Sequence, residues 1–244
     1  QGESGVVAYK GILYATHERF QAPVVAQESQ QVVLATEYGP ASDAGDPDAL
    51  NLVVYVNPNS TNPNKSVFMW QYGSAQKGGV TSKSYWANFV AENPDIIVVT
   101  PNHRGGFWGS IDLSALEGYE EQKETYQYSN NLARLDLLAC LKWINQNISA
   151  FGGNPDDVTI GGQSSGSNNC TCLLLMEEAR QYFSKAIMES SFSIDISLQP
   201  LGDAQFVSQE LFKVLGVASI DELMACSIEE INAAQAEVSS GSVN

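Results

Sequence analysis

The sequence predicts an α/β architecture in which helices flank a mostly parallel central sheet with an antiparallel N-terminal edge. Runs of apolar, strand-like residues alternate with helix-like segments, which is the order found when crossover helices join parallel strands. The runs at 67–70 and 95–100 are apolar with little alternation, which is typical of strands covered on both faces. Alternating segments at 5–14 and 31–36 instead indicate antiparallel pairing at one edge of the sheet.

The strongest helix prediction covers residues 130–148. Its apolar residues recur at helical spacing and form one stripe, which consists of Leu137, Leu141, Ile144 and Ile148. The segment Phe151-Gly152-Gly153-Asn154-Pro155 then carries the glycine and proline signals that end a helix. We therefore expect one long amphipathic helix that is followed by a short strand.

The remaining elements are predicted from the same periodicities. Further strands are expected at 51–56, 158–161 and 185–189. Further helices are expected at about 83–92 and from about 165 onward, and the segment 202–238 is expected to form two or three amphipathic helices.

The charge balance excludes one broad class of partner. The chain has 12 basic and 28 acidic residues, so its formal net charge is 12 − 28 = −16. Nucleic acids and anionic membrane surfaces are polyanions, so neither is an expected partner. The sequence also lacks an apolar run of about 18 residues, so no membrane-spanning helix is expected.

The cysteines and histidines do not form a metal-binding pattern. The only histidines are His17 and His103, and neither is spaced with a cysteine as zinc ligands are, so no metal and no cofactor is expected. The four cysteines, which are Cys140, Cys170, Cys172 and Cys226, are expected to be free thiols, mostly buried. Unpaired thiols favour a cytoplasmic location, and a secreted protein stays an open alternative.

One pentapeptide carries a chemical signal. Gly162-Gln163-Ser164-Ser165-Gly166 matches the G-x-S-x-G nucleophile elbow, with a predicted strand before it and a predicted helix after it. Such a turn presents the serine hydroxyl above the sheet, and glycines two positions away remove side chains that would collide with the backbone. The following helix directs its N-terminal dipole at the site, and the Ser165 N–H can face a developing oxyanion. The sequence therefore predicts Ser164 as a nucleophile, although the pattern also occurs by chance in loops rich in glycine and serine.

Blocks along nearly the whole chain resemble type-B carboxylesterases and cholinesterases. The block 151–160 resembles the segment that leads into the catalytic serine of that family. Further blocks match in order, at Gly11 to Ala15 with Arg19-Phe20, Ala35 to Pro40, Asn102 to Arg104, Trp143 to Ile148 and Phe183 to Ser190. The resemblance implies that residues 1–244 are the N-terminal part of a single α/β-hydrolase domain. It also implies a serine carboxylic ester hydrolase that acts on small esters through an acyl-enzyme.

The oxyanion loop departs from that family. The family has an aromatic residue or histidine followed by three glycines, and the matching stretch here is Tyr72-Gly73-Ser74-Ala75. The resemblance implies oxyanion donors at Gly73, Ser74, Ala75 and Ser165. Serine and alanine keep the backbone N–H but lose the dihedral freedom of glycine. Two outcomes stay open, since the loop either still offers two donors or forms a degraded oxyanion hole.

Other departures are smaller. Gln163 stands where the family usually has glutamate, and Ala49 and Val217 stand where secreted relatives often carry disulfide cysteines. Four aromatic residues are candidates for the pocket wall, although a core role is favoured for the first of them: Trp70, Tyr72, Phe107 and Trp108.

The catalytic acid and base are not apparent in this sequence. In this fold the triad follows the chain order serine, acid, histidine, and no histidine follows Ser164. His103 replaces a tyrosine of the family, so a packing role is expected, and His17 is expected to be solvated. We therefore expect a complementary C-terminal chain or segment to supply the acid and base. An esterase-like binding protein with impaired catalysis is the main alternative, and a structural half used only in complementation is a third.

Overall fold

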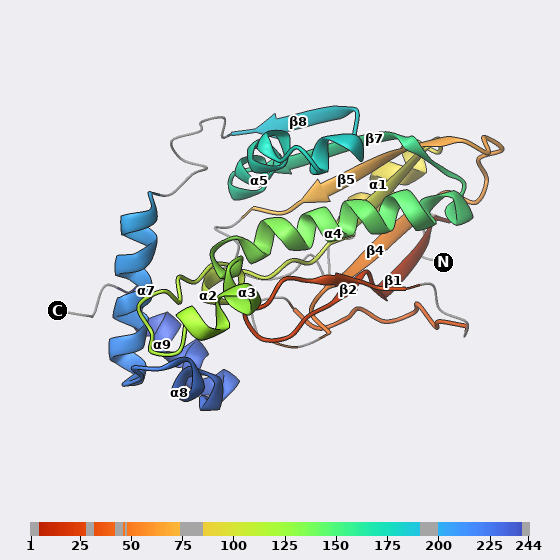
Figure 1. Cartoon of the computed structure of the whole chain (residues 1–244). Helices are drawn as coiled ribbons and strands as arrows, with labels where there is room; N and C mark the ends of the chain where they lie inside the picture. The colour runs from red at the N-terminus through yellow and green to blue at the C-terminus, as the bar shows by residue number, and fades with distance from the viewer. Residues whose placement is uncertain are drawn as a thin grey trace.

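The computed structural model describes residues 5–27, 32–41, 46, 48–73, 85–190 and 200–240. Within these residues six strands form one sheet in the order β1-β4-β6-β5-β7-β8, and β2 and β3 form a small hairpin beside it (Figure 1). The strands are β1 (Val7–Leu13), β2 (Ala15–Thr16), β3 (Val24–Val25), β4 (Asn51–Val56), β5 (Lys65–Gln71), β6 (Ile96–Pro101), β7 (Gly153–Gln163) and β8 (Lys185–Glu189). β1, β4 and β6 pair antiparallel, whereas β6, β5, β7 and β8 pair parallel. The predicted mixed α/β sheet with an antiparallel N-terminal edge is confirmed.

Helices cover both faces of this sheet. The helices within the described residues are α1 (Tyr85–Glu92), α2 (Gly106–Gly109), α3 (Lys123–Tyr126), α4 (Leu132–Asn147), α5 (Ser165–Leu175), α7 (Leu201–Leu215), α8 (Ile220–Ala225) and α9 (Ile228–Ser239). Alternate residues of β4 divide between the faces, because Leu52 and Val54 pack with α4 whereas Val53 and Tyr55 pack with α1. Strand periodicity therefore places α4 and α1 on opposite sides.

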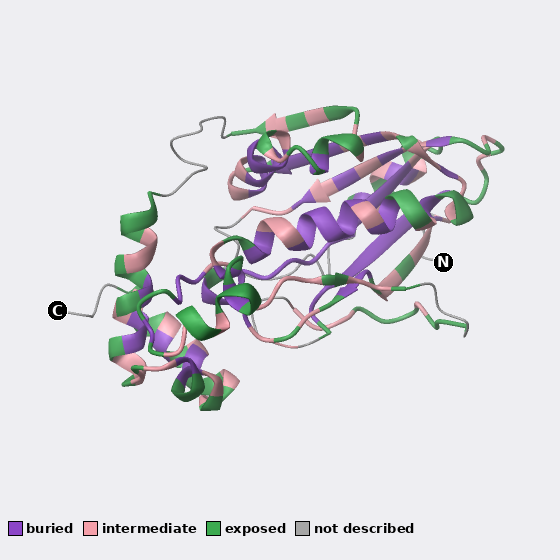
Figure 2. Cartoon of the chain, viewed as in Figure 1, coloured by how far each residue is buried: buried purple, intermediate pink, exposed green. Residues whose placement is uncertain are grey.

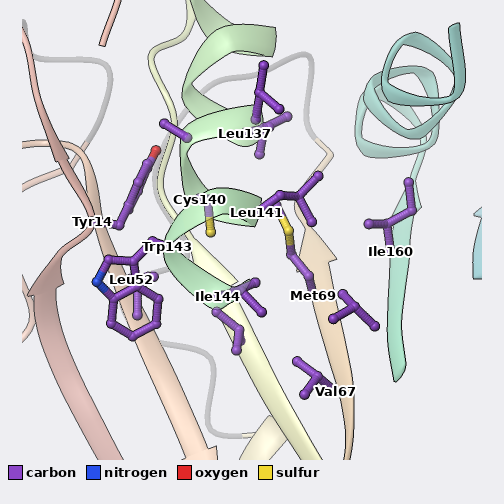
Figure 3. Packing of buried hydrophobic residues seen from close by; sticks show 14 of the residues in the cluster. Tyr14, Leu52, Val67, Met69, Leu137, Cys140, Leu141, Trp143, Ile144 and Ile160 are labelled. Carbon is purple, nitrogen blue, oxygen red and sulfur yellow. The ribbon is translucent and has the colours of Figure 1, made fainter. Parts of the chain in front are cut away.

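The predicted apolar stripe of α4 forms the centre of the main core. Leu137, Leu141 and Ile144 are fully buried and belong to one cluster with Val67 and Ile160 of the neighbouring strands (Figure 3). The central strands are mostly buried, whereas β8 at the sheet edge alternates between half-buried and exposed residues (Figure 2). Helix α4 therefore packs on one face of the central strands and holds these strands, and so their ends, in position.

A second core lies beside the sheet, where α7, α8 and α9 pack on the segment that connects β6 to α4 (Figure 1). Within residues 200–240 the chain forms three helices, so the prediction of two or three amphipathic helices for 202–238 is confirmed. Helix α9 begins with a capping box, in which Ser227 accepts from the N–H of Glu230 and the Glu230 side chain accepts from the N–H of Ser227. The local sequence therefore sets where this helix starts.

The strand predicted at 31–36 is wrong for its described residues. Residues 32–36 have no strand structure, although the Lys10 N–H donates to the Ala35 carbonyl at 2.9 Å. Val33 and Leu34 are 59% and 84% exposed, so the described part of the chain provides no layer on which a strand here could bury its apolar side chains. Periodicity alone did not indicate that this segment has no face to bury.

A helix that crosses a bilayer must be about 20 residues long and predominantly apolar. Among the residues that the structure describes, none of the helices is both long and apolar enough to span a membrane.

Candidate active site

Ser164 occupies the junction between β7 and α5. Its backbone dihedrals are φ 56° and ψ −124°, a positive-φ conformation that favours glycine. Such a conformation costs on the order of 1–3 kcal/mol and persists only when the surroundings enforce it. Two hydrogen bonds do so, because the Ser164 N–H donates to the Glu189 carbonyl at 2.9 Å and the Asn168 N–H donates to the Ser164 carbonyl at 3.1 Å. The Ser164 side chain remains half-buried.

The two glycines of the pentapeptide allow a close backbone approach. A Cβ atom on Gly162 would overlap the carbonyl group of Gly166. A Cβ atom on Gly166 would overlap the carbonyl oxygen of Gln71 and lie 2.8 Å from the carbonyl oxygen of Tyr72. These neighbours are backbone atoms, so they cannot rotate away as a side chain can. The glycines therefore let the start of α5 rest directly on the end of β5.

The end of β5 brings Gly73 beside the serine. A Cβ atom on Gly73 would lie 2.5 Å from the Gln163 carbonyl oxygen and 3.2 Å from the Ser164 Cβ. Ser165 is the first residue of α5, so its N–H is among the helix-end donors that have no intrahelical partner. Gly73 and Ser165, which are distant in the sequence, therefore flank Ser164. The other predicted oxyanion residues, Ser74 and Ala75, lie outside the described residues.

Gln163 is the exposed last residue of β7 and lies in register with Glu189 of β8. Its neutral side chain adds no charge next to Ser164. Among the described residues there is no group of three or more histidine, cysteine or acidic side chains that could hold a metal ion.

His103 is completely buried, in agreement with its expected packing role. Its ring stacks on the Tyr72 ring with centroids 4.7 Å apart and planes 9° apart. The Tyr72 hydroxyl donates to the His103 carbonyl at 3.2 Å. Burial lowers the pKa of His103, so its imidazole is neutral near pH 7.

The prediction of a solvated His17 is wrong. The residue is half-buried, and its Nε2 atom is inaccessible to solvent. Burial lowers the pKa of His17, and the nearby Arg104 guanidinium lowers it further. The sequence places His17 among polar neighbours, but the β2–β3 hairpin that carries this residue packs against α4.

A buried ion pair near the site was not anticipated from the sequence. Arg104 follows β6, and its guanidinium Nη2 lies 2.7 Å from Asp136 Oδ1 on α4, with both side chains at most 2% exposed. The Arg104 N–H donates to Asp136 Oδ2 at 2.9 Å, and Nη1 donates to the Gln21 carbonyl at 2.8 Å. The signal that could have revealed the pair is the acidic Asp136 within an otherwise apolar stretch of helix.

Two of the four candidate pocket aromatics belong to the second core instead. Phe107 and Trp108 are buried there, and the Trp108 indole N–H donates to the Asn232 side chain of α9 at 2.7 Å. Trp70 packs against Trp86 of α1 with ring centroids 5.2 Å apart, which agrees with the favoured core role. Of the four, Tyr72 is the residue that directly precedes the predicted oxyanion residues.

None of the four cysteines, all of which lie in the described part of the chain, forms a disulfide, as expected. Cys140, Cys170 and Cys172 are buried, whereas Cys226 is half-buried. Burial raises the pKa of Cys170 to about 12, so this thiol stays protonated at neutral pH and is a poor nucleophile.

A mixed sheet covered by helices, with a strained serine between the strand β7 and the helix α5, defines the class of α/β-hydrolases with a nucleophile elbow. The model of the carboxylesterase family matches residues 1–240, and the chain belongs to this family. This result agrees with the family resemblance that the sequence blocks indicate.

Individual relatives agree with this assignment. The chain is 35% identical over 250 residues to the para-nitrobenzyl esterase of Bacillus subtilis, covering 94% of this chain and 49% of that protein. The crystal structure of the Geobacillus stearothermophilus carboxylesterase EST55 matches with a TM-score of 0.86 and 29% identity, covering 99% of this chain and 51% of that one. A structure of PNB esterase matches with a TM-score of 0.84 and 34% identity. The chain thus spans about half the length of these relatives.

Proposed function

We propose that this chain supplies the nucleophile of a serine carboxylic ester hydrolase, and that Ser164 is that nucleophile. The observation that carries the proposal is the backbone of Ser164, which is held at φ 56° between β7 and α5 with Gly73 against its side chain. A strained serine of this kind requires enforcement by its surroundings, and such residues cluster at functional sites. Family membership supports the same chemistry.

The proposed reaction has two stages. The Ser164 hydroxyl attacks the ester carbonyl carbon, its proton passes to a base, and the carbonyl oxygen becomes an oxyanion. The N–H groups of Ser165 and Gly73, with those of Ser74 and Ala75 as further candidates, would stabilise that charge. Collapse of this intermediate breaks the ester bond, releases the alcohol with a proton and leaves an acyl-enzyme. Water then releases the carboxylic acid and restores the hydroxyl.

We further propose that the acid and the base come from a complementary C-terminal chain or segment. No histidine follows Ser164 in this sequence, and the relatives are about twice as long. The β8 edge supports such a partner, because Ile187 on β8 is 46% exposed and Leu175 at the end of α5 is 52% exposed. Among the strands that the structure describes, β8 pairs with β7 alone, and such a sheet edge promotes association with a further strand.

The proposed substrates are small carboxylic esters. Support comes from the relatives named as a para-nitrobenzyl esterase and as carboxylesterases. The proposed chemistry uses side-chain and backbone groups alone, so it requires no cofactor.

Labelling with a fluorophosphonate probe tests the proposal, because the probe reacts covalently with activated serines. The natural protein that contains this chain should be labelled at Ser164, as located by mass spectrometry of the modified peptide. Ser164→Ala should abolish both labelling and hydrolysis of a p-nitrophenyl ester. Ser184→Ala is the matched control, since Ser184 is an exposed serine ahead of β8 and its loss should leave labelling unchanged. Intact-mass analysis of the native material identifies any second chain.

A second candidate function is an esterase-like binding protein with impaired catalysis. The observations that favour it are Ser74 and Ala75 in place of oxyanion-loop glycines and the lack of a histidine after Ser164. Loss of one oxyanion donor typically lowers the rate by a factor of about 10²–10³. Failure of the probe to label Ser164 with the C-terminal segment present would favour this alternative over the hydrolase.

A further inference from the structure

We propose that His103 is a positioning residue, whose ring clamps Tyr72 and thereby holds Gly73 beside Ser164. The proposal rests on the proposed function, because it assigns His103 a role in shaping the same oxyanion site. His103 itself is not expected to touch substrate.

The clamp begins with the two contacts that fix Tyr72. Its ring lies parallel to the His103 imidazole, with centroids 4.7 Å apart and an angle of 9° between the planes. Its hydroxyl donates to the carbonyl oxygen of the same histidine at 3.2 Å. One contact sets the plane of the tyrosine ring and the other sets the position of its far end, so together they restrict both side-chain torsions.

His103 is itself held rigidly. The residue is fully buried, and its Nδ1 lies 3.0 Å from the Arg104 carbonyl oxygen. A carbonyl oxygen only accepts hydrogen bonds, so Nδ1 carries the proton and donates it. Arg104 is in turn fixed by its ion pair with Asp136 on α4. The clamp is therefore anchored to the long central helix and not to a free loop.

The backbone of Gly73 packs closely against the elbow, so a small displacement of Gly73 would change the geometry of the site. It follows Tyr72 directly, so the two Cα atoms are about 3.8 Å apart and a displacement of one residue moves the other. Its backbone lies close enough to Gln163 that a Cβ atom would be 2.5 Å from the Gln163 carbonyl oxygen. The Tyr72 carbonyl oxygen also packs against Gly166 of the elbow. A shift of Tyr72 therefore changes the spacing between Gly73 and Ser164.

The clamp requires a neutral imidazole. Within the part of the chain that the structure describes, Nε2 of His103 is buried and has no hydrogen-bond partner. A proton on Nε2 would create a buried donor without an acceptor and a buried charge, and both carry a desolvation cost. Burial lowers the pKa of His103, which agrees with a neutral imidazole. The contribution of His103 to the stack is thus a flat, uncharged ring, and a phenyl ring reproduces that stacking face although it lacks the Nδ1–H donor to Arg104.

Two variants of the natural protein separate the clamp from general packing. His103→Phe keeps a flat ring, whereas His103→Leu removes it. Hydrogen exchange of the peptide that contains Tyr72 and Gly73, measured by mass spectrometry, reports on the clamp without requiring activity. We expect His103→Leu to raise exchange there at least several-fold and to lower kcat for a p-nitrophenyl ester by about 10-fold or more with little change in KM. His103→Phe should keep both within about 3-fold.

Phe20→Leu is the matched control. Phe20 forms another parallel stack, with Trp108 at 5.4 Å and 13°, but it belongs to the second core. Its substitution should lower the melting temperature while leaving kcat and the exchange at residues 72–73 unchanged. If His103→Leu does not fold, Tyr72→Leu removes the same stack from the other side and should give the same exchange and kcat changes.

The possible results test the positioning role of His103 separately from the proposed hydrolase function. Wild-type exchange at residues 72–73 in a folded His103→Leu protein would overturn the proposal, as would a His103→Phe protein that behaves like His103→Leu. If the wild-type protein is not labelled at Ser164, the proposed hydrolase function fails, and the exchange measurement still decides whether His103 positions Gly73.

Discussion

Gly166 and Gly202 differ in what surrounds their missing side chains. At Gly166 a Cβ atom would overlap the Gln71 carbonyl oxygen, whereas at Gly202, near the start of α7, no atom lies within 4 Å of it. Each is the second residue of its helix, and neither has a positive φ. The same substitution therefore has opposite expected consequences at the two positions.

We predict that Gly166→Ala lowers the free energy of unfolding by about 2 kcal/mol or more and removes fluorophosphonate labelling, because a methyl group there would force α5 away from β5. Gly202→Ala should instead leave the stability unchanged or raise it by up to about 1 kcal/mol, since alanine favours the helix. Urea denaturation and labelling check both outcomes. A stable, fully labelled Gly166→Ala protein would contradict this prediction, because α5 and β5 could then lie farther apart than in this structure without loss of the reactive serine.

At the scale of elements, the ion pair between Arg104 and Asp136 joins the end of β6 to α4. Both charges are buried, and Asp136 accepts three separate N–H donors of Arg104, namely the backbone N–H, Nε and Nη2. Removing one partner of such a pair leaves an uncompensated buried charge, which is more costly than the loss of the contact itself. The surface pair between Lys123 and Glu120 has no such consequence, because both side chains are more than half exposed.

We predict that Asp136→Ala lowers the free energy of unfolding by about 3–5 kcal/mol, and that Glu120→Ala changes it by no more than about 1 kcal/mol. Chemical denaturation at two salt concentrations measures both. Similar losses in the two variants would mean that the buried pair contributes no more than a surface pair.

At the scale of the whole molecule, both histidines bear on stability against acid. Burial lowers the pKa of His103 and of His17, so each binds protons less readily in the folded state than in the unfolded chain. The ordinary pKa of histidine is about 6.5, so below that value the unfolded state takes up more protons than the folded state. Stability contributed by the neutral histidines is therefore present above about pH 6.5 and is lost as the pH falls.

We predict that the free energy of unfolding decreases between pH 7.5 and pH 5.5, measured by urea denaturation. Around His103 the Asp136 carboxylate raises its pKa and Arg134 lowers it, and burial is the larger effect. His103→Phe removes one titrating group, so this variant should show a weaker pH dependence. An equally steep loss in His103→Phe would assign the acid sensitivity to other groups.

The fold and the candidate site differ in how far the sequence predicts them. The α4 stripe, the elbow pentapeptide and the helices of 202–238 depend on neighbours within a few residues, so periodicity and turn residues suffice for them. The prediction of a strand at 31–36 was wrong because the alternating pattern carries no information about whether another layer covers the segment. The prediction that His17 is solvated was wrong for the converse reason. Its polar neighbours in the sequence do not reveal that the β2–β3 hairpin packs on α4.

The sequence by itself determined the mixed sheet, the position of the strained serine between a strand and a helix, and membership of the carboxylesterase family. These are local or collinear properties, encoded by residues that are close in the chain. Only the tertiary structure decided that Gly73 lies against Ser164, that His103 stacks on Tyr72, and that Phe107 and Trp108 belong to a core. Such contacts join residues tens of positions apart, and their existence depends on how whole layers pack and exclude water rather than on any pattern of neighbours.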